Sequence, residues 1–245
     1  MTHDTYEFEF KHPNANQSHG CWAGGHYMIY VNDADGNEIT HPYSPVSTLD
    51  VLGSQTYVIK IYRPHKDFPN GGKFTQALEK VNVGESLKFK GPVGYIKYHG
   101  NGEFIWNGVA LPRKSKIGLL LGGTGVTPGL SMASASILGK DGCDVKLLNF
   151  NKTKDDILCQ DIIDGLKSRN AKKFEYKNVL TRDPTWNGLK GRFSADMAKD
   201  FFGTSWAPED HVFFFVCGPP AFDTHCKKVL ADMGYVKNIH FAWKE

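Results

Sequence analysis

The stretch LLLGGTGVTPG, residues 119–129, joins an aliphatic run to a glycine-rich turn and then to a segment of helical character. Gly122, Gly123 and Gly125 allow a sharp turn directly after a strand, and Pro128 suits the first turn of a helix. The free amides at such a helix start attract phosphate groups. A tight turn without a ligand would use the same residues, and the spacing differs from the G-x-G-x-x-G pattern of dinucleotide-binding turns.

Around this stretch, apolar runs of strand length alternate with segments of helical periodicity. The strands are predicted at 116–123, 144–151, 173–181 and 211–218, and the helices at 128–140, 155–170, 194–202 and 220–235. Such alternation is typical of a parallel sheet covered by helices, a Rossmann-like α/β domain. We expect this domain to span residues 116–245.

The earlier part of the chain follows the two-residue period of β-strands. Strand-like runs occur at 5–10, 25–41, 55–63 and 84–98, with one short helix predicted at 74–81. Antiparallel strands with little helix predict a small β-barrel over residues 1–100. Residues 101–115 carry glycine, proline and charge without a clear period, and we expect them to be a linker between two domains.

Composition excludes several classes of protein. A chain of 245 residues with 40% hydrophobic content can bury a sizeable core, and a net charge of +3 without a long basic run argues against nucleic-acid binding. Ten histidines and five cysteines show no metal-ligand spacing, so no metal site is predicted. Free, scattered cysteines and the lack of a signal peptide or of about 20 consecutive apolar residues predict a soluble, cytoplasmic protein without a membrane segment, although a longer form could be membrane-anchored.

Three further motifs are suited to ligands, each weakly by itself. FVCGPPAF, residues 215–222, ends a predicted buried strand, so Cys217 should lie on the same sheet edge as the 122–128 turn; a lone buried cysteine is more often a small hydrophobe. GGKFT, residues 71–75, places paired glycines, a lysine and a threonine before a short helix. HPYSPVS, residues 41–47, could be only a proline-stiffened turn.

The order of the motifs is more specific than any one of them. HPYSPVS, G-G-K-x-[ST], G-P-x-G, G-G-T-G-x-T-P and C-G-P-P follow one another along nearly the whole chain. This order resembles the ferredoxin-reductase-like FAD/NAD(P)H flavoenzymes, and within them the NADH-cytochrome b5 reductase family. NFNKTKDDI and TWNGLKG are most similar to the reductase domain of cytochrome b5/b5 reductase fusion proteins.

The resemblance implies a barrel domain that binds FAD and a second domain that binds NADH or NADPH. It places Tyr43 on the isoalloxazine ring, Ser44 near N5, Thr127 near the flavin edge and Cys217 beside the nicotinamide, as the catalytic centre. The other implied FAD contacts are His41, Pro42, Val58, Lys60, Tyr62, Phe68 and Gly72, with the backbone amides of Lys73, Phe74 and Thr75 on the pyrophosphate. The other implied NAD(P)H contacts are Gly122, Gly123, Thr124, Asn151, Lys152, Thr181, Arg182, Gly218, Pro219 and Pro220.

The chain departs from the family pattern at two functional positions. His41 stands where most members carry an arginine that pairs with the FAD phosphates; histidine is shorter and only partly charged at neutral pH, so we predict weaker flavin retention. Thr181, followed by Arg182, replaces the acidic residue that repels a 2′-phosphate. Arg182 with Lys152 or Lys154 could pair with that phosphate, which predicts that NADPH is accepted, unless these are simply solvated surface charges.

The implied function is hydride transfer from NAD(P)H to FAD, followed by single-electron transfer to a cytochrome b5-like heme protein, by a monomer. Lysines near the flavin edge could steer an acidic cytochrome. Three alternatives remain: the same module serving a ferric chelate or a nitrate-reductase-type heme domain, a flavin-binding electron-transfer subunit of a larger complex, and a nucleotide-binding barrel protein without redox activity. The chain also begins inside the family pattern, which could reflect a trimmed amino terminus.

Overall fold

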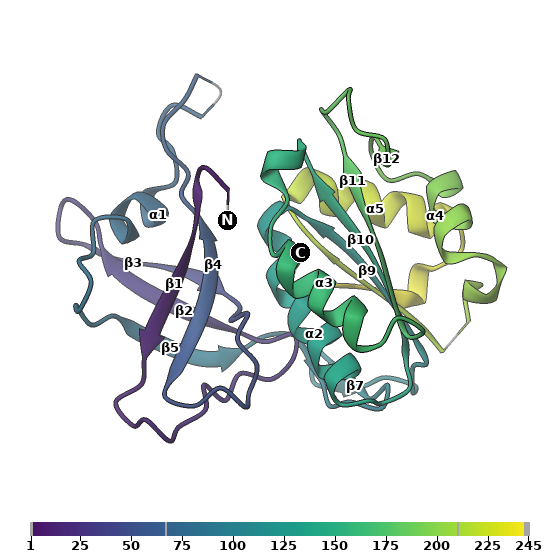
Figure 1. The fold of residues 1–245 in the computed structure, drawn as a ribbon, viewed down its shortest axis with the longest axis horizontal. Helices are drawn as coiled ribbons and strands as arrows, with labels where there is room; N and C mark the ends of the chain where they lie inside the picture. Colours follow the sequence, from purple (N-terminus) through teal and green to yellow (C-terminus); the bar gives the residue numbers. More distant parts are fainter. Residues whose placement is uncertain (1, 67, 210, 243–245) are drawn as a thin grey trace.

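The protein folds into two domains that lie side by side, as the computed structural model shows (Figure 1). The structure describes residues 2–66, 68–209 and 211–242. The amino-terminal domain holds antiparallel strands, and the carboxy-terminal domain holds a parallel sheet with helices on both faces. This is the predicted order of domains.

The amino-terminal domain is built from two small antiparallel sheets around one core. In one, β1 (Thr5–Lys11) pairs with β4 (Ser54–Lys60); in the other, β2 (His26–Asn32) lies between β3 (Glu38–Tyr43) and β5 (Lys88–Val93). Ile29, Tyr57, Ile59 and Leu78 are buried between them. The helix α1 (Lys73–Leu78) is shorter than the predicted 74–81, because its carboxyl cap already falls at Glu79.

The carboxy-terminal sheet has six parallel strands in the order β12-β11-β10-β9-β13-β14. The strands are β9 (Lys116–Gly122), β10 (Asp144–Asn151), β11 (Phe174–Leu180), β12 (Leu189–Lys190), β13 (Val212–Cys217) and β14 (Ile239–Phe241). The four predicted strands are the four central ones, whereas β12 and β14 are too short to carry a periodic signal. Strand order reverses between β9 and β13, and ligands of open α/β sheets bind at such a reversal, at the carboxyl ends of the strands.

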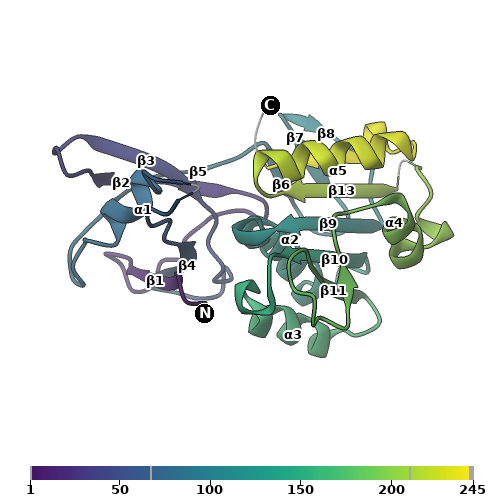
Figure 2. The same ribbon diagram turned by 90° about the horizontal axis from the view of Figure 1, so that it is seen from above.

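The helices cover both faces of this sheet (Figure 2). They are α2 (Val126–Leu138), α3 (Gln160–Arg169), α4 (Ala195–Phe202) and α5 (Pro220–Asp232), joined by the 3-10 turns η1 (Gly123–Gly125), η2 (Lys154–Asp156), η3 (Thr204–Trp206) and η4 (Val236–Asn238). Side chains of α2 and α3 share a core with one face, and those of α4 and α5 share a core with the other.

One helix boundary differs from the sequence prediction. The segment 155–170 was expected to be one helix, but α3 begins only at Gln160. Thr153 and Asp156 form a capping box around η2, and Cys159 has a left-handed backbone with φ of 55°. These two features interrupt the helix, since an α-helix requires negative φ throughout.

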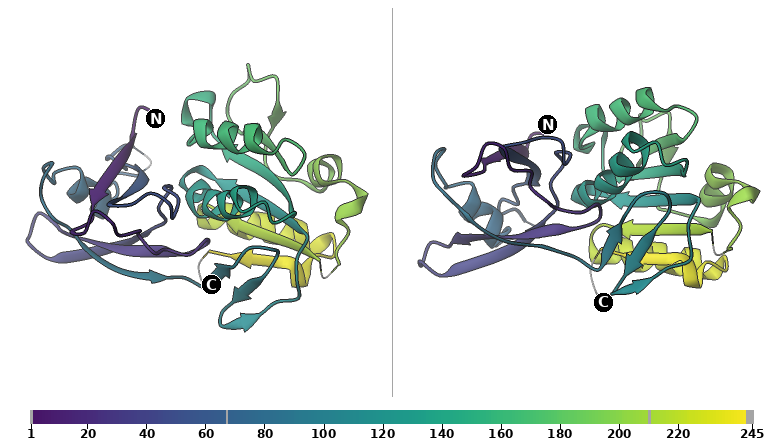
Figure 3. Two further views of the ribbon diagram at one scale, coloured as in Figure 1. Left: turned by 60° about the horizontal axis from the view of Figure 1, so that its bottom comes forward. Right: turned by 90° about the horizontal axis from the view of Figure 1, so that it is seen from below.

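The segment 101–115, expected to be a linker, contains two strands of a three-stranded antiparallel sheet: β6 (Ile96–Tyr98), β7 (Phe104–Trp106) and β8 (Val109–Ala110). Figure 3 shows these teal strands beside the carboxy-terminal domain. The Phe104 ring stacks on Phe213 of β13 with 4.0 Å between ring centroids. These strands therefore share the core of the carboxy-terminal domain.

Three further features concern membranes, metals and disulfides. Within the described residues, no helix combines the length and the apolar character that crossing a bilayer requires. In the same residues, no three histidine, cysteine, aspartate or glutamate side chains gather where they could hold a metal ion. The described cysteines form no disulfide bond with one another.

Candidate functional site

A pocket of about 450 Å³ opens in the amino-terminal domain between β3, the loop after β4 and α1. Its lining residues are Ile39, Thr40, His41, Tyr43, Tyr62, Phe68, Gly72, Lys73, Phe74 and Thr75. Three segments that the sequence analysis linked to FAD thus converge on one cavity. Ile39 and Thr40 were not predicted, although their places on β3 beside His41 could have indicated them.

Aromatic rings form much of the pocket wall. The Tyr43 and Phe74 ring centroids lie 5.5 Å apart, and the His41 ring lies 5.1 Å from Tyr43 and 5.8 Å from Phe74. Burial raises the pKa of Tyr43, so its phenol is neutral at physiological pH. His41 is exposed as a whole, but the neighbouring rings desolvate its imidazole and lower its pKa, against a weaker opposing effect of the Pro42 carbonyl. The wall therefore offers flat, uncharged surfaces.

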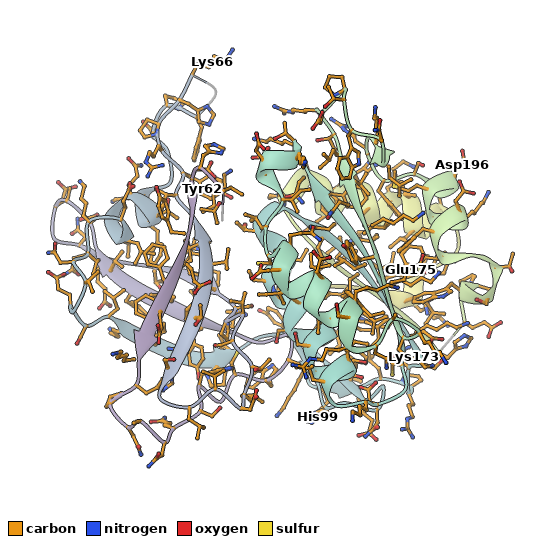
Figure 4. The ribbon with its side chains drawn as sticks, in the orientation of Figure 1. Tyr62, Lys66, His99, Lys173, Glu175 and Asp196 are labelled. Atoms are coloured by element: carbon orange, nitrogen blue, oxygen red, sulfur yellow. The ribbon has the colours of Figure 1, made fainter. Side chains whose placement is uncertain are left out.

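The outer rim of the pocket leaves large apolar side chains uncovered. Tyr62 is 40% exposed and Phe68 is 43% exposed, with their ring centroids 6.5 Å apart. Figure 4 shows Tyr62 on the side of its domain that faces the carboxy-terminal domain, while Lys66 lies at the tip of the same loop. Paired exposed aromatic rings beside a cavity are typical of a surface that a ligand covers.

The loop before α1 is fixed by hydrogen bonds. The Thr75 hydroxyl accepts from the Tyr62 backbone N–H at 3.1 Å and donates to the Gly72 carbonyl at 3.1 Å. Gly71 has φ of 60°, and a Cβ there would lie 2.5 Å from the Tyr62 carbonyl oxygen. The first amides of α1, which have no partner within a helix, consequently border the pocket at a fixed place.

Lys73 adds a permanent cation to this rim. Its Nζ lies 2.6 Å from the Asp33 carboxylate, and this contact, with backbone donors from Asn37 and Asp35, lowers the pKa of Asp33 to about 2. The same carboxylate raises the pKa of Lys73. The rim thus combines apolar rings, helix amides and a cation, and this combination fits both the flat ring system and the phosphates of FAD.

The other residues implied for FAD lie outside the lining of the pocket. Ser44 is buried, and its hydroxyl donates to the Gly25 carbonyl at 2.8 Å. Pro42 pairs with Met28 in the sheet, and Val58 is buried on β4. Lys60 Nζ lies 2.7 Å from Asp4 and 3.8 Å from Asp156. The flavin-contacting roles of these four residues remain predictions.

A second candidate site lies at the carboxyl ends of β9 and β13. A Cβ on Gly125 would lie only 2.1 Å from the Cys217 carbonyl oxygen, so the turn and the strand end are in direct backbone contact. The predicted proximity of Cys217 to the 122–128 turn is therefore confirmed. Thr127 is 7% exposed, and its hydroxyl donates to the Thr124 carbonyl at 3.3 Å.

The ends of β10 and β11 complete this edge of the sheet. The Asn151 carbonyl accepts from both the backbone N–H and the hydroxyl of Thr181, and the Arg182 N–H donates to the Lys152 carbonyl at 2.8 Å. The Asn151 side-chain amide is buried and has no hydrogen-bond partner among the described residues. Leaving such an amide without a partner costs about 1–3 kcal/mol, and its place at this edge keeps Asn151 a predicted ligand contact.

One carboxylate near this edge was not predicted. Asp183 follows Thr181 by two residues and accepts hydrogen bonds from the backbone and hydroxyl of Thr185. The Thr185 hydroxyl lowers the pKa of Asp183, so the group is charged at neutral pH. The Asp183 carboxylate is occupied by these hydrogen bonds within its own turn, so it does not take the place of an acidic residue at position 181, directly after β11.

The two candidate sites face the same domain boundary. Strand β4, next to the aromatic pocket, contacts η1 of the glycine turn. Figure 1 shows β4 on the side of its domain that faces α2 and α3. The arrangement can therefore hold a flat cofactor in one domain and a second nucleotide on the other, with their reactive ends close together.

Comparison with known families agrees with this arrangement. The oxidoreductase FAD-binding domain matches residues 1–98, and the oxidoreductase NAD-binding domain matches residues 119–228. An aromatic pocket joined to a glycine turn at a strand-order reversal, with these two matches, defines an FAD-dependent NAD(P)H oxidoreductase.

Individual relatives narrow the class. Human NADH-cytochrome b5 reductase 1 is 32% identical over 99% of this chain and 82% of its own length. Aspergillus niger nitrate reductase [NADPH] is 33% identical over 97% of this chain, which spans only 27% of that relative. The crystal structure of the cytochrome b5 reductase domain of Ulva prolifera nitrate reductase matches 98% of this chain and 92% of that domain with a TM-score of 0.90 and 28% identity. The chain belongs to the NADH-cytochrome b5 reductase family.

Proposed function

We propose that this protein transfers a hydride from NADPH or NADH to FAD and then passes electrons singly to a cytochrome b5-like heme protein. The observation that carries the proposal is the contact between β4 and η1, which joins the aromatic pocket to the glycine turn across the domain boundary. The cytochrome b5 reductases among its relatives support the choice of acceptor.

The residues of the two sites supply placement. Bound FAD would accept the hydride and release electrons one at a time. Tyr43 and Phe74 offer uncharged faces for a flat ring, and the amides that begin α1, with Lys73, suit its phosphates. Cys217 and Thr127 are both buried at the junction and keep water from it. Hydride transfer between stacked rings needs alignment and no general base.

A nitrate-reductase-type heme domain is the second candidate acceptor. The identity to the Aspergillus niger enzyme and the TM-score of 0.90 to the Ulva prolifera reductase domain support it. Both candidate acceptors are one-electron heme centres, so the same reductase geometry serves either.

Anaerobic stopped-flow spectroscopy tests the proposal. The FAD-loaded protein is mixed with NADPH or NADH, and the reduced protein is then mixed with cytochrome b5 or with an isolated nitrate-reductase heme domain. We expect the flavin absorbance to bleach and cytochrome b5 to be reduced faster than the other heme domain. Bleaching followed by electron transfer to neither heme would favour a ferric chelate or another acceptor, and no bleaching with either nucleotide would reject the proposal.

Substitution of His41 by arginine is expected to tighten FAD binding. Desolvation by the neighbouring rings lowers the pKa of His41, so at pH 8 the imidazole carries no charge for the FAD phosphates, whereas arginine is always charged. One added charged hydrogen bond predicts a Kd about tenfold lower, as measured by fluorescence titration of the apoprotein. His99→Arg is the matched control, since His99 is exposed and lies away from the pocket, outside its lining (Figure 4). Equal FAD affinity in wild type and His41→Arg would contradict the role given to His41.

Substitution of Arg182 by alanine is expected to lower kcat/KM for NADPH about tenfold and to leave kcat/KM for NADH within twofold. Arg182 follows Thr181 at the sheet edge. Position 181 carries a threonine in place of a carboxylate that would repel a 2′-phosphate, so Arg182 can pair with that phosphate. Steady-state kinetics with both nucleotides measure the effect. Lys172→Ala, an exposed cation at the opposite end of β11, serves as control. An equal loss of kcat/KM for NADPH and NADH would show that Arg182 does not bind the 2′-phosphate.

A further inference from the structure

Lys60 lies between two carboxylates that belong to different domains. Its Nζ is 2.7 Å from Asp4 Oδ2, just before β1, and 3.8 Å from Asp156 Oδ1, at the end of η2. The side chains of Lys60 and Asp156 are only 22% and 18% exposed. Charge pairs that are partly buried are screened less by salt than pairs on the open surface. The contact therefore links the strand beside the aromatic pocket to the loop after β10.

The Asp156 carboxylate is held rigidly in its own loop. Its Oδ2 accepts from the Thr153 backbone N–H at 3.1 Å and from the Thr153 hydroxyl at 2.7 Å. The capping box occupies Oδ2, so Oδ1 is the oxygen that faces Lys60. Because the loop directly follows Asn151 and Lys152, a shift of the loop also moves the sheet edge that the nucleotide would contact.

Lys60 is itself anchored in the amino-terminal domain. Burial opposes the effect, but the hydrogen bond and the charge of Lys60 together lower the pKa of Asp4, so this carboxylate is charged at neutral pH. The Lys60 ammonium is thus fixed on one side while it reaches Asp156 on the other.

We propose that Asp156 is a positioning residue that acts through Lys60: their ion pair sets the loop after β10 against β4 and aligns the nucleotide site with the flavin pocket. This inference rests on the proposed hydride transfer. A misplacement of about 1 Å at reacting atoms can cost on the order of 100-fold in rate, so a weak tether between domains can matter for the alignment.

Asp156→Asn tests the proposal because asparagine keeps an oxygen acceptor for Thr153 and removes the charge that faces Lys60. Asp155→Asn is the matched control, since Asp155 is the exposed neighbour in the same loop and the change in net charge is identical. At saturating NADPH or NADH, we expect flavin reduction to slow about tenfold in Asp156→Asn and to stay within twofold in Asp155→Asn.

A second readout does not depend on activity. In the apoprotein, backbone amides of residues 152–158 and of β4 should exchange hydrogen faster in Asp156→Asn than in Asp155→Asn or wild type. If Asp156→Asn disturbs the capping box, Lys60→Met tests the pair without a change in the loop. In the double variant Asp156→Asn/Lys60→Met, the loss of flavin-reduction rate, expressed as a free energy, should be smaller than the sum of the losses in the two single variants.

Equal reduction rates and equal exchange in the two asparagine variants would overturn the proposal, as would fully additive losses with Lys60→Met. Failure of the proposed function gives a different result. If wild-type protein does not bleach with either nucleotide, the hydride step is absent, yet the exchange difference would still report the ion pair between the domains.

Discussion

Replacing Gly125 with alanine is expected to reduce NAD(P)H-dependent flavin reduction about 100-fold and to destabilise the protein by about 1–3 kcal/mol. A Cβ at this position would lie 2.1 Å from the Cys217 carbonyl oxygen, 2.5 Å from its carbon and 2.9 Å from the Gly218 nitrogen. All three are backbone atoms, so no rotamer change relieves the contact. The turn must move away from the end of β13, and both elements border the proposed nicotinamide site. Stopped-flow reduction and urea unfolding measure the two effects.

Gly165→Ala is the matched control for Gly125→Ala. Gly165 is exposed in α3, and a Cβ there meets no atom within 4 Å. Alanine in a helix interior is more favourable than glycine by about 0.5–1 kcal/mol, so this variant should be slightly more stable and fully active. Gly129→Ala provides a graded case, because its Cβ would meet side-chain atoms of Leu121, which can move. A Gly125→Ala protein with wild-type rate and stability would show that the close backbone contact has no functional role.

The fold was predictable where the hydrophobic pattern is local and long. Strands β9 and β13 are nearly continuous apolar runs, β10 and β11 are mixed but of strand length, and the helices between them show a helical period, so these elements were predictable from sequence. Strands of two or three residues, such as β12 and β14, carry no period. The start of α3 depends on the capping box of Thr153 and on the left-handed backbone of Cys159, which a count of apolar residues does not show.

The candidate site was predictable from the order of its motifs. The family resemblance that this order carries implied FAD contacts at His41, Tyr62 and Lys73, and the three residues line one pocket. Tertiary placement decides the rest. The contact of Lys60 with Asp156 joins residues far apart in sequence, and the missing partner of the Asn151 amide depends on everything packed around it. The Ser44 hydroxyl is equally tied to Gly25 by the way β2 and β3 meet, which no motif encodes.

Acidification is expected to destabilise the protein through His240. Its ring is 3% exposed, stacks on Phe213 with 4.6 Å between centroids and meets Trp106 edge-on at 5.1 Å. Burial, with a smaller effect from the Lys114 charge, lowers the pKa of His240 to about 4. The unfolded chain takes up this proton near pH 6.5, so stability is greatest above that pH and is lost between pH 6.5 and 4. We expect a loss of about 2 kcal/mol from this group between pH 7 and pH 5, as measured by urea unfolding.

His240→Phe separates this titration from general acid sensitivity. Phenylalanine keeps a flat ring between Phe213 and Trp106 and removes the proton uptake, so the free energy of unfolding should fall about 2 kcal/mol less between pH 7 and pH 5 than in wild type. A decline remains, because burial also lowers the pKa of His26 to about 4. Both ring nitrogens of His240 lack hydrogen-bond partners among the described residues, so the variant should be at least as stable as wild type at pH 7.5. Identical pH profiles for the two proteins would show that His240 does not govern the acid response.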